Sequence, residues 1–155
     1  MERTKNGITY PENIMQALQA RKIGCSYDKG KRLVYVLYEG RFGGIYSIYS
    51  EDGRGGFINF TLYPFCVAES RRQETGEYLA KLNRQASPVT FYIDQETGCI
   101  AFCNQYRIPD QGDDRGQALD HFCLETHKAC INYQVSLYMA VNKGKNHINR
   151  EPKTY

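Results

Sequence analysis

The sequence predicts one α+β domain built on an antiparallel sheet of about five strands, in the order helix, three strands, helix, two strands, helix. Three observations predict it. The chain has 155 residues, which suits one ordinary domain with its own core. Its hydrophobic fraction of 41% and charged fraction of 24% are typical of a globular protein rather than a disordered one. Strand-like segments come in runs separated by single helices, as in α+β folds.

The first predicted element is a helix over 11–21. Pro11 suits the first turn of a helix, and Ile14, Met15 and Leu18 recur at helical spacing. We expect this helix to be short, because Gly24 marks its end.

A meander of strands follows, because the hydrophobic period changes to two after residue 25. Three strands are expected, at 33–38, 45–50 and 57–63. The segments between them are rich in glycine, which supplies the positive φ angles that tight turns require. Residues 25–27 are a candidate for one further short strand.

A second helix is predicted over 69–83, with Asn83 as a left-handed C-terminal cap. A β-hairpin is predicted next, with strands at 89–93 and 99–104. Its five-residue loop ends in Gly98, as longer hairpin loops often do.

The last predicted element is a long helix over 116–141 with two apolar arcs. One arc holds Leu119, Phe122, Cys123, Cys130, Tyr133, Leu137, Ala140 and Val141. The other holds Leu124, Ile131, Val135 and Tyr138. A helix that is apolar on two sides is usually covered on two sides. We therefore expect the second arc to contact another helix, a second copy of the chain or a partner polypeptide.

The net charge of +3 belongs to the end of the chain. Residues 143–155 carry that whole surplus, while residues 1–142 are balanced. We therefore expect a neutral folded domain over 1–142 and a basic, mobile tail over 143–155.

The sequence also favours a cytoplasmic protein. No stretch approaches the roughly 20 apolar residues that a membrane span needs, so no membrane association is expected. Residues 1–10 lack the apolar region of a secretory signal. The six cysteines are accordingly expected to be reduced thiols.

Four sets of segments within residues 69–141 form a recognisable pattern: Arg71-Arg72, Glu77-Tyr78-Leu79 with Leu82-Asn83, the hairpin from Phe91 through Asp94 and Gly98 to Ile100 and Phe102, and Asn132-Tyr133 with 137–141. In these segments the chain resembles the YbjN-like domain family, within the broader type III secretion chaperone-like fold. Each of these motifs marks a cap, a turn or a core contact rather than a chemical site.

The resemblance implies a small cytoplasmic bacterial protein, often dimeric, without agreed catalytic residues and with sensory or regulatory labels. Related secretion chaperones bind extended segments of partner proteins and tend to be acidic. The neutral charge of this domain departs from that pattern.

Cys123, His127 and Cys130 fall on one face of the last helix and, with Cys99 or Cys103, could supply four zinc ligands. We favour core packing instead, since two of these cysteines lie in the apolar arc and no CxxC motif holds them. We expect no metal and no cofactor.

Two other kinds of chemical site are weakly indicated. Three imidazoles, at His121, His127 and His147, could pair with a thiol, but no electropositive setting surrounds the cysteines. The acidic residues at 110, 113 and 114 lack the ligand spacing of a calcium loop. We therefore expect no catalytic residues.

Nucleic-acid binding is an open alternative. The chain has 13 tyrosines and 7 phenylalanines, with Arg32, Arg41 and Arg54 near the predicted strands. It has no RNP1 motif and no dense basic stripe. We therefore predict a non-enzymatic protein-binding module, chaperone-like or a regulatory adaptor, acting as a homodimer. The alternatives are a nucleic-acid-associated regulatory protein and, less favoured, a small Cys/His enzyme.

Overall fold

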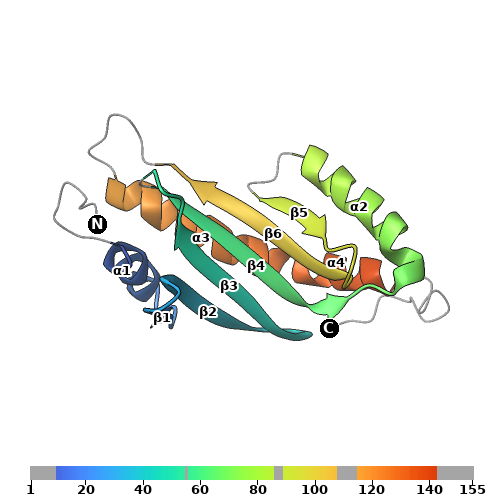
Figure 1. Cartoon of the computed structure of the whole chain (residues 1–155), viewed down its shortest axis with the longest axis horizontal. Coiled ribbons are helices and arrows are strands. Elements are labelled where there is room, and N and C mark those ends of the chain that lie inside the picture. Colours follow the sequence, from blue (N-terminus) through green and yellow to red (C-terminus); the bar gives the residue numbers. More distant parts are fainter. Residues whose placement is uncertain (1–9, 55, 86–88, 108–114, 143–155) are drawn as a thin grey trace.

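The computed structural model describes residues 10–54, 56–85, 89–107 and 115–142, with the side chains of 115–117 left out (Figure 1). It confirms the predicted α+β class and element order. The elements are α1 (Glu12–Ala20), β1 (Ser26–Asp28), β2 (Leu33–Gly40), β3 (Gly43–Glu51), β4 (Phe57–Cys66), a short 3-10 turn (Glu69–Arg71), α2 (Arg72–Arg84), β5 (Thr90–Ile93), β6 (Cys99–Tyr106), α3 (Arg115–Asn132) and α4 (Gln134–Val141).

The sheet is antiparallel and has six strands in the order β1-β2-β3-β4-β6-β5. It is one strand larger than predicted, because β1 pairs with β2 through Tyr27 and Val34. The β5–β6 hairpin joins the meander by its second strand, so that β6 lies beside β4 and β5 forms the edge. Gly98, with φ of +79°, ends the hairpin loop as expected.

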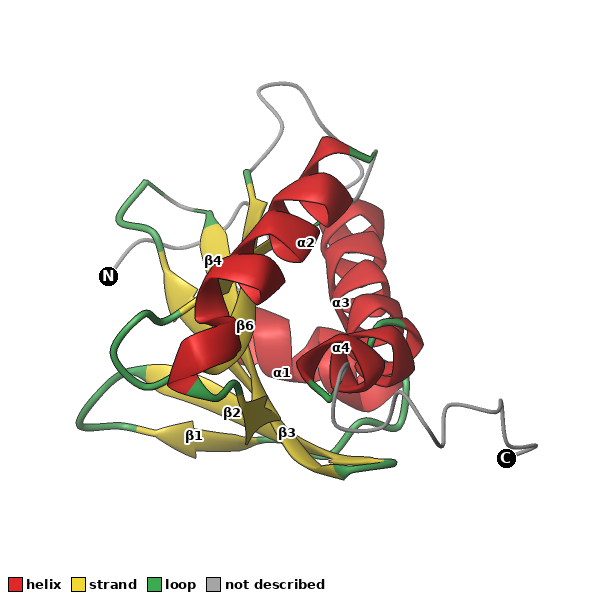
Figure 2. Ribbon diagram, turned by 90° about the vertical axis from the view of Figure 1, so that its right-hand side faces the viewer, coloured by secondary structure: helices red, strands yellow, loops and turns green. Residues whose placement is uncertain are grey.

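The helices gather on one side of the sheet. Figure 2 shows α3 and α4 facing the sheet from the same side, and α1 packs on α3. Leu18 and Phe102, contributed by α1 and β6, are fully buried in the core between these layers. The opposite side of the sheet carries no described helix (Figure 1).

The helix α2 runs beside β5 and covers the edge of the sheet. Asn83 does this with its side chain: its Nδ2 donates to the Phe91 carbonyl at 2.8 Å, and its Oδ1 accepts from the Phe91 amide at 2.7 Å. The prediction that Asn83 is a left-handed cap is wrong, because α2 continues through it to Arg84. The amide instead satisfies backbone groups that an edge strand leaves unpaired.

The predicted long helix is interrupted at Tyr133, which separates α3 from α4. The cause is a tertiary contact. The Tyr63 hydroxyl lies 3.2 Å from the carbonyl oxygen of Ala129 and 3.0 Å from that of Cys130. The Tyr133 amide still donates to the Ala129 carbonyl at 3.2 Å, but the Cys130 carbonyl, which the Gln134 amide would use in an unbroken helix, is taken by the inserted hydroxyl.

A polar cluster lies inside the core between β3, β4 and α3. Ser47, Asn59 and Thr61 are fully buried. Asn59 Nδ2 donates to Ser47 Oγ at 2.7 Å, Thr61 Oγ1 donates to Asn59 Oδ1 at 2.7 Å, and the two hydroxyls lie 3.0 Å apart. Because each side chain has partners within the cluster, its burial is tolerated.

Within the described ranges, no helix combines the length and the apolar character that crossing a bilayer requires. The predicted tail, 143–155, lies outside the described residues.

Candidate functional site

The side of the sheet away from the helices carries two rows of side chains that cross five strands. Strand pairing aligns Leu37, Tyr46, Leu62, Ala101 and Tyr92 in one row. It aligns Tyr35, Ile48, Phe60, Cys103 and Thr90 in the other. We call these ten residues, with Ile58 of β4, the outer face.

Three side chains of the outer face are strongly exposed. Leu37 keeps 54% of its surface accessible, Tyr46 49% and Tyr92 38%. The rings of Phe60 and Tyr92 lie 5.7 Å apart between centroids, so these side chains pack against each other across β6. The outer face is thus a mainly apolar surface, in which Thr90 is the exposed polar member and Ala101 is buried beneath its neighbours.

The charged side chains on this side of the sheet stand at its margins. Asp28 ends β1, Glu39 is the next-to-last residue of β2, and Asp94 and Arg107 directly follow β5 and β6, whereas none of the eleven outer-face residues is charged. An apolar centre with a polar margin is the usual anatomy of a protein–protein contact surface.

Strand β4 shows how unusual this surface is. It points Asn59 and Thr61 into the core and Ile58, Phe60 and Leu62 toward the open side. The inward set also includes Phe57, Tyr63 and Phe65, so β4 carries apolar side chains on both faces, whereas a strand with one solvated face normally alternates apolar and polar residues. The sequence shows the alternation, but without the position of the helices it does not show that the apolar set lies outside.

The four helix residues predicted to contact a partner are half-buried in this chain. Tyr138 stacks on Phe42 with 3.8 Å between ring centroids. Ile131 and Tyr138 pack against the core, and Leu124 and Val135 are partly accessible. Their role in partner contact stays a prediction.

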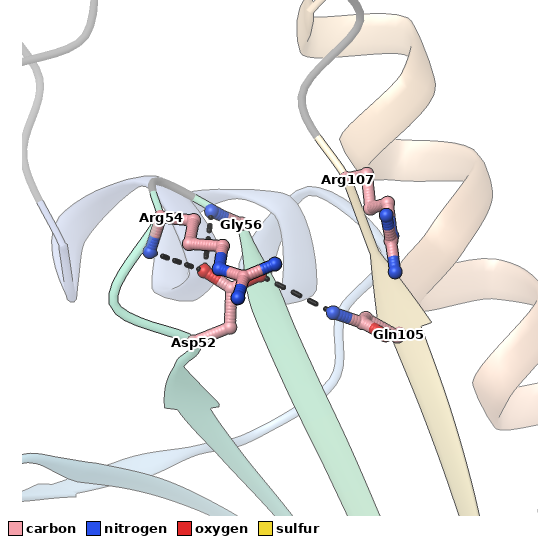
Figure 3. A pocket seen from close by; sticks show the side chains of 5 residues that line it. All are labelled: Asp52, Arg54, Gly56, Gln105 and Arg107. Carbon is pink, nitrogen blue, oxygen red and sulfur yellow. Dashed lines mark hydrogen bonds between the residues drawn. The ribbon is translucent and has the colours of Figure 1, made fainter.

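A shallow hollow of about 150 Å³ lies at the end of the sheet where β3 turns into β4 (Figure 3). Asp52, Arg54, Gly56, Gln105 and Arg107 line it. One Asp52 oxygen accepts from the backbone amides of Arg54 at 2.7 Å and Gly56 at 3.0 Å, and the other accepts from Gln105 Nε2 at 3.3 Å.

The Asp52 carboxylate is therefore occupied in holding its own loop. Burial acts to raise its pKa, but the hydrogen bonds from Arg54, Gly56 and Gln105 together lower it. The side of the hollow free for a ligand offers two exposed guanidinium groups, Arg54 and Arg107. Such a hollow can attract a small anion, and the carboxylate in its lining is already hydrogen-bonded to its own loop and to Gln105.

The proposed zinc set does not come together. Cys123 and Cys130 belong to α3 and are fully buried on the helix side of the sheet. Side chains alternate along β6. Ile100 and Phe102 are buried in the core, so Cys99 and Cys103 point to the opposite side of the sheet. The described residues contain no cluster of three or more metal-ligating side chains.

The helix thiols are poor nucleophiles. Burial raises the pKa of both Cys123 and Cys130 to about 12, so they stay protonated near neutral pH. His127 packs its ring 4.8 Å from that of Tyr38, and burial lowers its pKa. His121 is exposed beside Glu125, at 3.6 Å. His147 and the acidic residues at 110, 113 and 114 lie outside the described residues.

The three arginines considered for nucleic-acid binding lie at three different turns. Arg32 precedes β2 and pairs with Glu51 at 2.9 Å. Arg54 lines the hollow, and Arg41 lies at the opposite end of the sheet, where its amide donates to Gln134. They do not form one basic stripe along the outer face.

Comparison with known proteins adds no assignment: no family model and no curated protein matches the chain.

Proposed function

We propose that this protein is a non-enzymatic protein-binding module that self-associates through the outer face of its sheet. The observation that carries the proposal is the uncovered row on β4: this strand places Ile58, Phe60 and Leu62 on the side without described helices, although its inward positions already supply the core. A continuous apolar surface of this size on a folded chain marks a contact site.

The size of the outer face suits a second copy of the chain. The five strands that it crosses are four to ten residues long and average about eight; at about 3.3 Å per residue and about 4.8 Å between strands, this side of the sheet spans on the order of 600 Å², with the outer face at its centre. A standard protein interface buries about 800 Å² per partner. Two outer faces stacked about 10 Å apart would form a sandwich of ordinary dimensions.

The charge of the outer face also suits a second copy. In a two-fold dimer the same patch meets itself, so any central charge would face a like charge. None of the eleven outer-face residues carries one. The exposed tyrosines at 46 and 92 supply the aromatic contact that interfaces favour.

The helix arc is a weaker candidate for this contact. None of its four residues is among the exposed large hydrophobic side chains, and Tyr138 is engaged with Phe42. The outer face provides three such side chains. We therefore propose the outer face of the sheet, rather than the helix residues named from the sequence, as the surface of self-association.

The experiment compares two matched substitutions by light scattering after size exclusion. Leu37→Glu places a carboxylate on the outer face at a side chain that is 54% exposed. Met139→Glu makes the equivalent change on α4, at 43% exposure. Both side chains are accessible, so both variants should fold.

We expect the wild type and Met139→Glu to be dimers and Leu37→Glu to be a monomer. Circular dichroism and thermal unfolding verify that each variant is folded. A monomeric wild type at high concentration overturns self-association, as does a Leu37→Glu variant that dimerises as well as the wild type. Binding of a different protein to a monomeric wild type would assign the outer face to that partner and likewise overturn the proposal.

Single-stranded RNA is the second candidate occupant, because aromatic side chains on an open sheet are used by some RNA-binding domains to stack bases. The outer face lacks the cationic residues that track a phosphate backbone. We expect no change in the fluorescence anisotropy of a labelled single-stranded oligonucleotide at low salt.

The resemblance of residues 69–141 to the YbjN-like family supports the same proposal, since it implies small, often dimeric proteins without catalytic residues. We also propose a cytoplasmic location, in keeping with that resemblance.

A further inference from the structure

Two cysteines from distant parts of the chain face each other at one end of the sheet. Cys66 ends β4 and Cys99 begins β6, and they are directly opposite partners in the antiparallel ladder. Their sulfur atoms lie 3.3 Å apart. Cys66 is exposed and Cys99 is partly accessible, so reagents in solution can reach the pair.

The backbone geometry around the pair suits a covalent bond. The neighbouring amide of Val67 donates to the carbonyl of Gly98 at 2.9 Å, so Cys66 and Cys99 form the adjacent, non-hydrogen-bonded pair. Cα atoms in such pairs lie about 4.5 Å apart. Disulfides bridge Cα separations of about 4.4–6.8 Å. Closure therefore needs side-chain rotation and no rearrangement of the strands.

Arg72 fixes the surroundings of the pair. Its Nε donates to the Val67 carbonyl at 3.1 Å, and its Nη1 donates to the carbonyls of Gln95 at 2.9 Å and Glu96 at 3.2 Å. These contacts hold the strand after Cys66 and the loop before Cys99 together. The hydrogen bond with Cys99 and burial raise the pKa of Cys66, and the guanidinium of Arg72 opposes that rise.

The other four cysteines lack this arrangement. Cys123 and Cys130 are fully buried. Cys103 stands opposite Phe60 and Thr90, and Cys25 lies before β1, where burial raises its pKa. Among the described residues, the register brings only Cys66 and Cys99 into sulfur–sulfur contact.

We propose that Cys66 and Cys99 form a dithiol site that reacts with small-molecule disulfides and closes to a reversible intramolecular disulfide. In the first step the Cys66 thiolate attacks one sulfur of glutathione disulfide. A Cys66–glutathione bond forms, the glutathione disulfide bond breaks, and one glutathione leaves as a thiolate that takes up the proton released by Cys66.

In the second step the Cys99 thiolate attacks Cys66 Sγ. The Cys66–Cys99 bond forms, the mixed disulfide breaks, and the second glutathione leaves with the proton of Cys99. The protein loses two electrons and two protons, which the glutathione disulfide gains. An excess of a dithiol reagent reduces the Cys66–Cys99 disulfide back to two thiols and is itself oxidised to a disulfide, which makes the closure reversible.

The test exposes the reduced, full-length chain to excess glutathione disulfide under native conditions, followed by acid quenching. Free thiols are counted in denaturant and the intact mass is measured. We expect the wild type to lose two of its six thiols and two hydrogens of mass. Peptide mapping should show residues 66 and 99 linked. The mixed disulfide should stay below about a tenth of the protein, because the second thiol acts at an effective concentration of about millimolar or above.

Three variants make the result specific. Cys66→Ser and Cys99→Ser should each stop at a single glutathione adduct, because no second thiol is in reach. Cys103→Ser is the matched control on the same strand and should close as the wild type does. Accumulation of an adduct on the wild type without closure, linkage of Cys66 to another cysteine, or no reaction at either thiol would each overturn the proposal.

Discussion

The two faces of the sheet differ in a way that their sequences do not suggest. The inner face is sealed by helices although it carries the polar cluster of Ser47, Asn59 and Thr61. The outer face is also mostly apolar, yet the described helices leave it open (Figure 2). The polar cluster of the inner face is stabilised by its own hydrogen bonds, whereas the apolar outer face gains most when something covers it.

The comparison teaches that both faces of the central strands are built for burial. The inner face, which includes the side chains of Tyr49 and Phe102, is buried when the chain folds. The outer one, through Tyr46 and Leu62, is left for association. Folding and binding thus use opposite sides of the same strands.

The largest effect is expected from removing one aromatic ring on each face. Phe102→Ala, on the inner face of β6, should lower the free energy of unfolding by about 3–5 kcal/mol, since Phe102 is fully buried against Phe91 and Tyr63. Phe60→Ala, opposite Cys103 on the outer face, should cost about 1 kcal/mol or less in the monomer. Urea denaturation at low protein concentration measures both free energies of unfolding. Equal losses for the two variants would contradict the view that only the inner face is buried in the monomer.

A smaller loss is expected from Ile131→Asp on the helix. Ile131 is partly buried against the core, so an uncompensated carboxylate there should cost about 1–3 kcal/mol. Sedimentation should show that the folded fraction still dimerises. A stable, folded monomer would instead place the interface on the helix arc with Leu124, Val135 and Tyr138.

The polar cluster offers a third test. Asn59→Leu leaves Ser47 without its amide donor and should cost about 1–3 kcal/mol in thermal or urea unfolding. Replacing all three members with apolar residues of similar size, as Ser47→Ala, Asn59→Leu and Thr61→Val, should recover part of that loss, because no member is left unpaired. If the triple variant loses as much free energy of unfolding as the three single variants together, the hydrogen bonds of the cluster make a net contribution to stability.

The smallest effect concerns pH. Burial lowers the pKa of His127 in the folded chain, so the unfolded chain takes up a proton more readily. The stability that neutral His127 contributes is present above the unfolded pKa of about 6.5 and is lost as the pH falls below it. Urea unfolding at about pH 7.5 and about pH 5.5 should show a smaller decrease for His127→Gln than for the wild type.

The same substitution at the exposed His121 controls for the loss of an imidazole as such. An unchanged pH dependence in His127→Gln would contradict the attribution to this residue. The carboxylates with lowered pKa, Asp52 and Asp94, lose their protons in a more acidic range and do not interfere.

The element order could be predicted because local patterns determine it: period-two segments, glycine turns and helical spacing all appear in the sequence. The break at Tyr133 could not, because the hydroxyl that occupies the Cys130 carbonyl belongs to Tyr63, 67 residues earlier along the chain. The role of Asn83 was missed for the same reason, since its partner is the edge of another strand.

The candidate sites depend even more on register. The alternation of Ile58, Phe60 and Leu62 is visible in the sequence, but which side the helices cover is decided by the whole fold. The pairing of Cys66 with Cys99 follows from a shift in the β4–β6 register between Leu62 and Cys66. A shift of this kind leaves no signature in the spacing of cysteines.

The most direct test of the central claim is hydroxyl-radical labelling of side chains, read by mass spectrometry over a range of protein concentrations. Tyr46 and Tyr92 report on the outer face, and Met139, of similar exposure, reports on α4. We predict that labelling of both tyrosines falls as dimers form, while labelling of Met139 stays constant. Tyrosines labelled equally at every concentration, or protection confined to Met139, would contradict the account.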